Sequence, residues 1–275
     1  MTTPAIVVLT DFFAVSNRAL SYAAGLAVPL QSHLVLLHVR HDGLLSPEEY
    51  ADRHAERNAR QTQQALYALA EGQPVPTQVE ISEAFLPDAV AEAVRHHQPQ
   101  LLVLGRPGTA TTPVEVVTSA ALDVLRHVPF PLLIVPTVGW DTFPPRRLAL
   151  AVDGDSFSLY DNQHIVSDLL QALQGTLDVI HVVDQHDPGA EAYHRAMHTA
   201  QQSGVATALT PEHVRIVYHP KPAEGILQGA VEVKADLLVV VARRHSLLSS
   251  LFHRSVTAQL ISESPIPVLL LPALD

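Results

Sequence analysis

The sequence predicts an α/β protein with two doubly wound parallel sheets in tandem, and three features of the chain support this prediction. Short apolar runs alternate with longer amphipathic stretches along all 275 residues, as strands alternate with helices in α/β domains. The apolar runs are continuous in Val, Ile and Leu, as in parallel strands that are buried on both faces. The whole pattern then occurs a second time, which indicates a tandem duplication.

Four segments of the first half recur in the same order in the second half. The matched pairs are "IVVLTD" (6–11) with "ALAVDG" (149–154), "LVLLHV" (34–39) with "LDVIHVV" (177–183), "QLLVLG" (100–105) with "DLLVVV" (236–241), and "VPFPLLIVP" (128–136) with "SPIPVLLLP" (264–272). Between the copies lies "PTVGWDTFPPRR" (136–147), where one Gly and three Pro interrupt any regular pattern. We therefore expect two domains of ordinary size, at 1–140 and 141–275.

Each copy contains five strand-like runs separated by helix-like stretches. In the first copy we expect strands near 5–10, 33–39, 75–81, 100–104 and 131–135, and helices near 15–28, 47–71, 86–97 and 113–127. In the second copy we expect strands near 147–152, 176–183, 212–218, 236–241 and 267–271, with helices between them. Parallel sheets of this kind bind ligands beyond the carboxyl ends of their strands, where the strand order reverses. In the first copy those positions are 11, 39–41 and 105–112.

The composition of the chain argues against several classes of protein. Apolar residues make up 47% and charged residues 16% of the sequence, so we expect a packed interior. The formal net charge is −11 with no block of Lys or Arg, which argues against nucleic acid or a membrane surface as a partner. The absence of cysteine excludes disulfides, thiolate nucleophiles and zinc–cysteine sites. The start shows no secretory signal and the apolar runs are too short to cross a bilayer, so we expect a cytoplasmic protein.

Motifs at the predicted strands carry a resemblance to a known family. In the first copy they are "IVVLTDF", "SNRALSYAAGLA", "LVLLHV", "LLVLGRPG" and "TSAALDVLRHVPFPLLIVP"; in the second they are "LALAVDG", "IHVVD", "AEGI" with "ADLLVVV", and "SVTAQLISESPIPVLLLP". Over essentially its whole length the chain resembles a tandem universal stress protein. The resemblance implies two Rossmann-like domains, each with a five-stranded parallel sheet, that are related by a pseudo-twofold axis. It also implies that the domains pair through their last strands, "PLLIVP" and "PVLLLP".

The nucleotide-binding branch of that family has a signature of Gly, two residues, Gly, nine residues, then Gly followed by Ser or Thr, which surrounds the ATP phosphates. The spacing is kept here, with Thr118 in place of the third glycine. An Asp after the first strand and the backbone after the second hold adenine and ribose in that branch. On this chain the resemblance assigns ATP or another adenine nucleotide to a set in the first copy, namely Asp11, Val39, Gly105, Gly108, Thr118 and Ser119, and we add Arg106 as a nearby positive charge. Glycines let the backbone approach an anion closely, and an arginine adds a charge.

Departures from the signature argue against a nucleotide in the first copy. Pro107 has no N–H with which to bind a phosphate. Thr118 carries a β-branched side chain where the family pattern has no side chain. The rings of Phe12 and Phe13, directly after Asp11, could fill the space of a ligand.

A purely structural interpretation of the same stretch is also available. Thr112 to Glu115 resembles a capping box with Pro at the first helical position. An unbroken helix from there to His127 would contain Thr118 and Ser119, whose hydroxyls would bond to the preceding turn. The phosphate interpretation requires the loop to continue to Thr118. The sequence does not decide whether the helix begins near Thr112 or near Thr118, so both interpretations stay open.

The second copy departs further from the signature, because "VVVARRHSLLSSLFHRSVTAQL" (239–260) contains no glycine. Val241, Arg244 and Arg254 occupy the three glycine positions, followed by Ser255. Side chains at these places block a close approach of the backbone to phosphates, so we expect no ATP site here. Five basic residues of this stretch either hold a smaller anion or pair with the acidic surplus of the chain: Arg243, Arg244, His245, His253 and Arg254.

The resemblance implies ligand sensing or a stress response through binding and contact with partners, and we expect no catalysis. No motif assembles a nucleophile, a base and an orienting group, so no catalytic residue is assigned. His194 and His198 share a predicted helix face but lack a third ligand, so no metal site is expected either.

Two other functions stay open. One is an interaction or scaffold protein in which both nucleotide sites are degenerate. The other is a slow ATP hydrolase, which is disfavoured because no base is placed to activate water. The expected partners are an adenine nucleotide and the fused second domain, with a homodimer of whole chains left open.

Overall fold

The computed structural model describes residues 3–10, 14–40, 55–106, 114–138, 142–161, 163–183, 189–205, 209–243 and 255–274. The first domain consists of β1 (Ala5–Leu9), α1 (Ala14–Ala27), β2 (His33–Val39), α2 (Ala55–Glu71), β3 (Thr77–Ser82), α3 (Leu86–His97), β4 (Leu101–Arg106), α4 (Val114–His127) and β5 (Leu132–Pro136). These elements match the predicted ranges closely. The predicted helical residues 47–54 lie outside the described residues.

The second domain repeats the order of the first, as the sequence predicts. It consists of β6 (Arg147–Val152), α5 (Ile165–Leu173), β7 (Thr176–Val183), α6 (Gly189–Gln202), the 3₁₀ turn η1 (Pro211–His213), β8 (Val214–Tyr218), α7 (Pro222–Glu232), β9 (Leu237–Ala242), α9 (Val256–Glu263) and β10 (Val268–Pro272). The predicted strand at 212–218 begins with the short turn η1 instead, because Pro211 lies at its first position.

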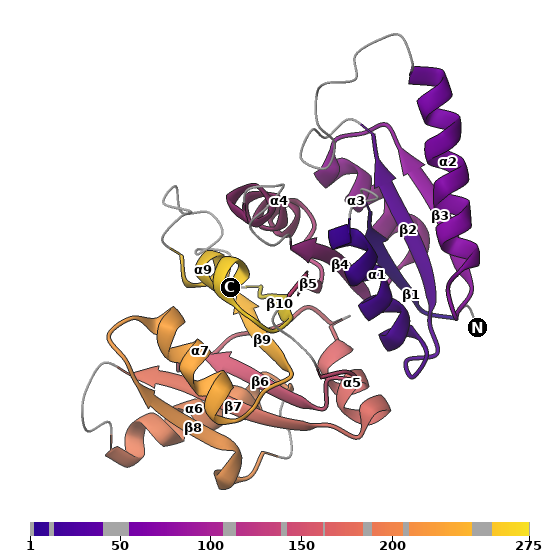
Figure 1. Ribbon diagram of the computed structural model, residues 1–275. Helices are drawn as coiled ribbons and strands as arrows, with labels where there is room; N and C mark the ends of the chain where they lie inside the picture. The colour runs from indigo at the N-terminus through magenta and orange to yellow at the C-terminus, as the bar shows by residue number, and fades with distance from the viewer. Residues whose placement is uncertain are drawn as a thin grey trace.

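The strands of both domains form one continuous ten-stranded sheet with the order β3-β2-β1-β4-β5-β10-β9-β6-β7-β8 (Figure 1). Within each domain neighbouring strands are parallel, whereas β5 and β10 pair antiparallel at the centre. Leu133 lies opposite Leu269 in this central pair. The α/β class, the parallel order within each domain and the pairing through the last strands are therefore confirmed.

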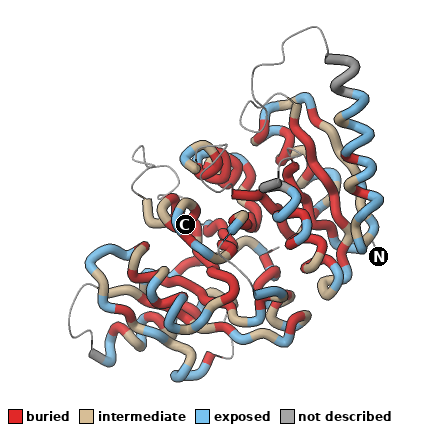
Figure 2. The backbone as a smooth tube through the Cα atoms, viewed as in Figure 1, coloured by how far each residue is buried: buried red, intermediate tan, exposed pale blue. Residues whose placement is uncertain are grey.

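Helices cover both faces of the sheet and create two apolar layers. One layer contains the buried faces of α3, α4, α7 and α9, and the other contains those of α1, α2, α5 and α6. The central strands are buried on both sides (Figure 2), as their uninterrupted apolar sequence predicts. At the junction of the domains, α4 packs beside α9 (Figure 1).

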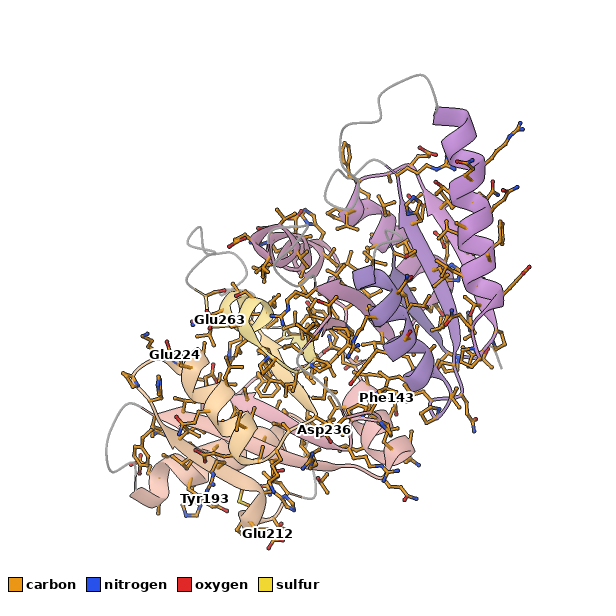
Figure 3. The ribbon with its side chains drawn as sticks, in the orientation of Figure 1. Phe143, Tyr193, Glu212, Glu224, Asp236 and Glu263 are labelled. Carbon is orange, nitrogen blue, oxygen red and sulfur yellow. The ribbon has the colours of Figure 1, made fainter. Side chains whose placement is uncertain are left out.

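The linker between the domains is held against α1 by an aromatic contact. Phe143 lies edge-on to Tyr22 with ring centroids 5.1 Å apart, and Figure 3 labels Phe143 between the two domains. Gly25 makes room for this ring, because a Cβ atom there would lie 2.3 Å from Phe143 Cζ. In the part of the chain that the structure describes, no helix is both long and apolar enough to cross a membrane.

Candidate ligand-binding site

The strand order of the N-terminal domain reverses between β1 and β4, which is where sheets of this type bind ligands. Val39 is the last residue of β2 and is buried, and Gly105 lies at the end of β4 opposite Val135. Both therefore lie at the expected edge of the sheet. Asp11 and Gly108, the other backbone and carboxylate positions of the predicted site, lie outside the described residues.

Arg106 does not offer its charge to the predicted phosphate position but binds the carboxyl end of α9 in the other domain. Its Nη1 donates to Ile261 O at 2.9 Å and also to Ser262 O, and its Nη2 donates to Ser264 O at 2.6 Å. The side chain is buried, and this burial lowers the pKa of the guanidinium from its ordinary value. A cation at a helix carboxyl end satisfies free carbonyls and interacts favourably with the helix dipole, so in this structure Arg106 connects the two domains.

Thr118 and Ser119 lie in the second turn of α4, which begins at Val114. Thr118 Oγ1 donates to Val114 O at 2.9 Å, and Ser119 is exposed. This is the helical alternative that the sequence left open, because the loop ends well before Thr118. Neither residue lies at the start of a helix. Pro113 and Thr112, the predicted cap, lie outside the described residues.

In the C-terminal domain an arginine is paired with the aspartate at the corresponding position of the sheet. Arg243 directly follows β9, and Asp153 directly follows the neighbouring strand β6. The Nε and Nη2 atoms of Arg243 each lie 2.9 Å from one carboxylate oxygen of Asp153. Arg243 also donates to Asp155 O and Ser156 O, at 2.8 and 3.0 Å. For Arg243 the structure thus has the predicted pairing with an acidic residue, while the other four basic residues lie outside the described residues.

The last helix of each domain begins at a different place relative to the serine that ends the signature, Ser119 in the first copy and Ser255 in the second. Ser255 is the N-cap of α9, and its Oγ accepts a hydrogen bond from Ala258 N at 3.0 Å. Ser119, its counterpart, lies inside α4. The second copy therefore keeps a helix start at the serine, although its sequence departs further from the nucleotide-binding pattern. The sequence analysis did not predict this helix start. The available signal was Ser255 itself, because serine is a preferred N-cap residue.

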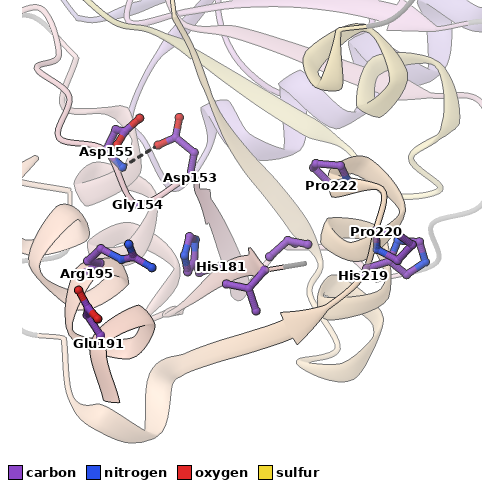
Figure 4. A pocket seen from close by; sticks show the side chains of 11 residues that line it. Asp153, Gly154, Asp155, His181, Glu191, Arg195, His219, Pro220 and Pro222 are labelled. Carbon is purple, nitrogen blue, oxygen red and sulfur yellow. Dashed lines mark hydrogen bonds between the residues drawn. The ribbon is translucent and has the colours of Figure 1, made fainter. Parts of the chain in front are cut away.

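Two hollows flank the Asp153–Arg243 pair and share Asp153, Val182 and Pro222 in their walls. The first is polar, has a volume of about 520 Å³ and is shown in Figure 4. In that view His181 lies between Arg195 of α6 and the Pro222 end of α7. The second hollow lies over β6 and β9, has a volume of about 660 Å³ and is lined mainly by aliphatic side chains.

A pair of histidines that the sequence analysis did not single out repeats in both domains. His181 Nδ1 lies 3.0 Å from Val152 O, and His38 Nδ1 lies 3.0 Å from Thr10 O. Because a carbonyl oxygen only accepts, Nδ1 of His181 carries the hydrogen of this bond, and the His181 ring lies in the wall of the polar hollow. The signal was present in the sequence, as the repeated "HV" at the end of the second strand of each copy.

Two doubly wound α/β domains are joined through their last strands into one sheet, and hollows lie beyond the strand ends of the C-terminal domain. The model of the universal stress protein family matches residues 3–136 and 145–272, and the chain belongs to that family.

Relatives and solved structures agree with this assignment. The chain is 39% identical over 83 residues to the universal stress protein in QAH/OAS sulfhydrylase 3′ region of Thermus aquaticus, a match that spans 29% of this chain and 61% of that protein's length. It is 31% identical over 126 residues to universal stress protein Sll1654 of Synechocystis sp., which spans 41% of this chain and 76% of the relative. The crystal structure of a universal stress protein from Archaeoglobus fulgidus matches with a TM-score of 0.67 at 15% identity, over 99% of this chain and 97% of that one, and so shares the fold.

Proposed function

We propose that this stress-response protein binds an adenine nucleotide in its N-terminal domain only. Family membership supports the role in a stress response. The observation that carries the asymmetry is the Asp153–Arg243 pair, because it occupies the strand-end carboxylate of the C-terminal domain. In the first copy the residue that corresponds to Arg243 is Pro107, which has no charge with which to occupy Asp11.

The phosphates would be held mainly by backbone groups. Arg106 is engaged by α9, and Thr118 is engaged by its own helix. The donors that we expect instead are the backbone amide of Gly108 and the amides in the first turn of α4, whose positive dipole end favours an anion. Val39, at the end of β2, is the residue we assign to adenine.

Isothermal titration of the full-length chain with Mg²⁺-ATP tests this proposal. We expect saturable binding of one nucleotide per chain. Gly108→Arg should abolish binding, because it places in the first copy the side chain that the second copy has at Arg244. The matched control is Arg244→Ala, which should leave both the affinity and the stoichiometry unchanged. Nucleotide binding that survives Gly108→Arg, or that is lost in the control, would overturn the assignment to the N-terminal domain.

A second candidate function is an interaction protein without nucleotide in either domain. The engagement of Arg106 and Thr118 favours it, because two of the predicted ligand groups serve the fold instead. The same titration decides between the two functions, since this alternative gives no saturable heat with ATP. If ATP does bind, we expect no ADP release above background over several hours, in line with a binding protein and not a hydrolase.

A further inference from the structure

The hollow over β6 and β9 of the C-terminal domain has the size and lining of a site for a small apolar molecule. Its volume of about 660 Å³ falls within the range of sites for small organic ligands. Nine of its lining residues are apolar: Ala151, Val152, Phe157, Val182, Pro222, Ile226, Val240, Val241 and Val256. They come from β6, β7, β9, α7, α9 and the segment after β6, so the hollow has walls from several elements.

The two charged residues that line this hollow in the described part of the chain are paired with each other. Its charged lining residues within the described chain are Asp153 and Arg243, which form the two-fold contact with each other described above. The Arg243 guanidinium also lies 5.9 Å from the centre of the Phe157 ring. A polyphosphate requires unpaired cations or a glycine cradle, and this lining supplies neither in the described residues. The described lining therefore does not suit a polyphosphate and suits a largely apolar molecule with at most one charged group.

One end of the hollow is polar and presents hydrogen-bond donors. Ser255, Val256 and Thr257 line it at the start of α9. Ala258 N and Gln259 N are bonded to Ser255, but the amides of Val256 and Thr257 precede the first carbonyl that the helix can offer them. Thr257 is only 5% exposed, and its hydroxyl has no hydrogen bond within the described residues. An oxygen of a ligand would satisfy these donors and the dipole of α9.

We propose that the C-terminal domain binds a small organic molecule with an apolar body and one oxygen acceptor group, such as a medium-chain carboxylate. The body lies on the aliphatic lining over β6 and β9, and the oxygen accepts from the start of α9. This site differs in ligand class from the nucleotide site proposed for the N-terminal domain and does not depend on it. The duplicated fold would then present one polar and one apolar ligand to the same ten-stranded sheet.

Titration of the full-length chain with decanoate by calorimetry, and displacement of bound anilinonaphthalene sulfonate by decanoate, test this proposal. We expect saturable binding of one decanoate per chain, with much weaker displacement by decylamine, whose head group donates and cannot accept. Ile226→Phe should lower the affinity about tenfold or more by filling the hollow. Thr257→Val keeps the side-chain shape and should lower it roughly threefold to tenfold by removing one hydrogen bond.

Control variants separate this site from general hydrophobicity and from the nucleotide site. Val231→Phe adds an aromatic ring to the exposed face of the same helix, α7, and should leave decanoate binding unchanged. Gly108→Arg should also leave it unchanged, so that the two proposed sites fail or succeed separately. The proposal is overturned by the absence of saturable decanoate binding, by equal displacement with decylamine, by wild-type affinity in Ile226→Phe, or by competition between ATP and decanoate.

Discussion

Arg243 lies against Asp153 with two guanidinium nitrogens each 2.9 Å from a different carboxylate oxygen. The arginine side chain is 10% exposed and the aspartate side chain 55% exposed, so the pair joins a mostly buried cation to a carboxylate at the surface. It links the carboxyl ends of β6 and β9, the two strands between which the order of the second domain reverses. Arg243 thus holds the segment after β6 through the carbonyls of Asp155 and Ser156. Its positive charge is at the same time neutralised by the Asp153 carboxylate.

Replacing Arg243 should destabilise the protein measurably. Arg243→Met keeps the apolar bulk but removes four hydrogen bonds, and we expect it to lower the free energy of unfolding by about 1–2 kcal/mol. The cost stays moderate because the freed Asp153 can be hydrated. Urea unfolding followed by circular dichroism measures it. Arg215→Met removes an exposed ion pair with Glu232 and should change the value by no more than about 0.5 kcal/mol; equal effects of the two variants would contradict the prediction.

Arg106 should couple the two domains through α9. Arg106→Met leaves the carbonyls of Ile261, Ser262 and Ser264 without this donor, and we expect a loss of about 2–3 kcal/mol in the free energy of unfolding. Hydrogen exchange gives a local readout, because the amide of Ser264 donates to Leu260 O at the affected helix end. That amide should exchange faster in the variant.

The corresponding helix end in α7 supplies the control for this experiment. The amide of Val233 donates to Gly229 O there, away from Arg106, and its exchange should not change. Faster exchange at both helix ends would indicate global destabilisation and would refute a specific coupling through Arg106.

The signature serines of the two copies should respond differently to the same substitution. Ser255→Ala removes the N-cap of α9 and should cost about 1 kcal/mol. Ser119→Ala lies on an exposed face inside α4, where Ala has the higher helix propensity, so stability should stay level or rise by up to about 0.5 kcal/mol. Thermal or urea unfolding of the two variants side by side measures the difference, and similar losses in both would contradict the helix starts described here.

Tyr22 should make stability depend on pH in the alkaline range. Burial, with a smaller effect of the Asp236 carboxylate, raises the pKa of the Tyr22 hydroxyl above its ordinary value of 10.0. The unfolded chain therefore ionises first, so this contribution is complete below pH 10 and is lost as the pH rises further. Between pH 9 and pH 11, wild type should lose stability more steeply than Tyr22→Phe, by up to about 1.4 kcal/mol per pH unit. If the stability of wild type and of Tyr22→Phe, measured by urea unfolding, changed equally with pH, the prediction would be wrong.

The fold followed from the sequence because its signals are local and long. Runs such as "LLVLG" and "LLVVV" are short, continuous and rich in Val and Leu, as is typical of buried parallel strands. Each motif alone is a weak indication of the fold, but the same motifs occur in the same order in both copies, and this repetition makes the prediction specific. Even the helix that contains Thr118 was available as an alternative from its capping pattern.

The site was harder to predict because its side chains are directed by distant partners. Arg106 donates to carbonyls of the other domain, and the sequence near Arg106 contains no signal that predicts these distant partners. The pairing of Arg243 was foreseen only in kind, since Asp153 follows a different strand. The hollow over β6 and β9 arises where several elements meet, so no single stretch of sequence encodes it.

The antiparallel contact of β5 with β10 has a consequence for how the chain is made. During synthesis the first domain is complete before β10 has left the ribosome. Until β10 pairs with it, β5 is an exposed edge strand of the sheet. All five residues of β5 are buried in the finished protein, and an apolar rim of this kind invites pairing with a neighbouring chain. The time needed to translate the second domain therefore determines how long the β5 edge of each nascent chain stays unpaired and prone to aggregation.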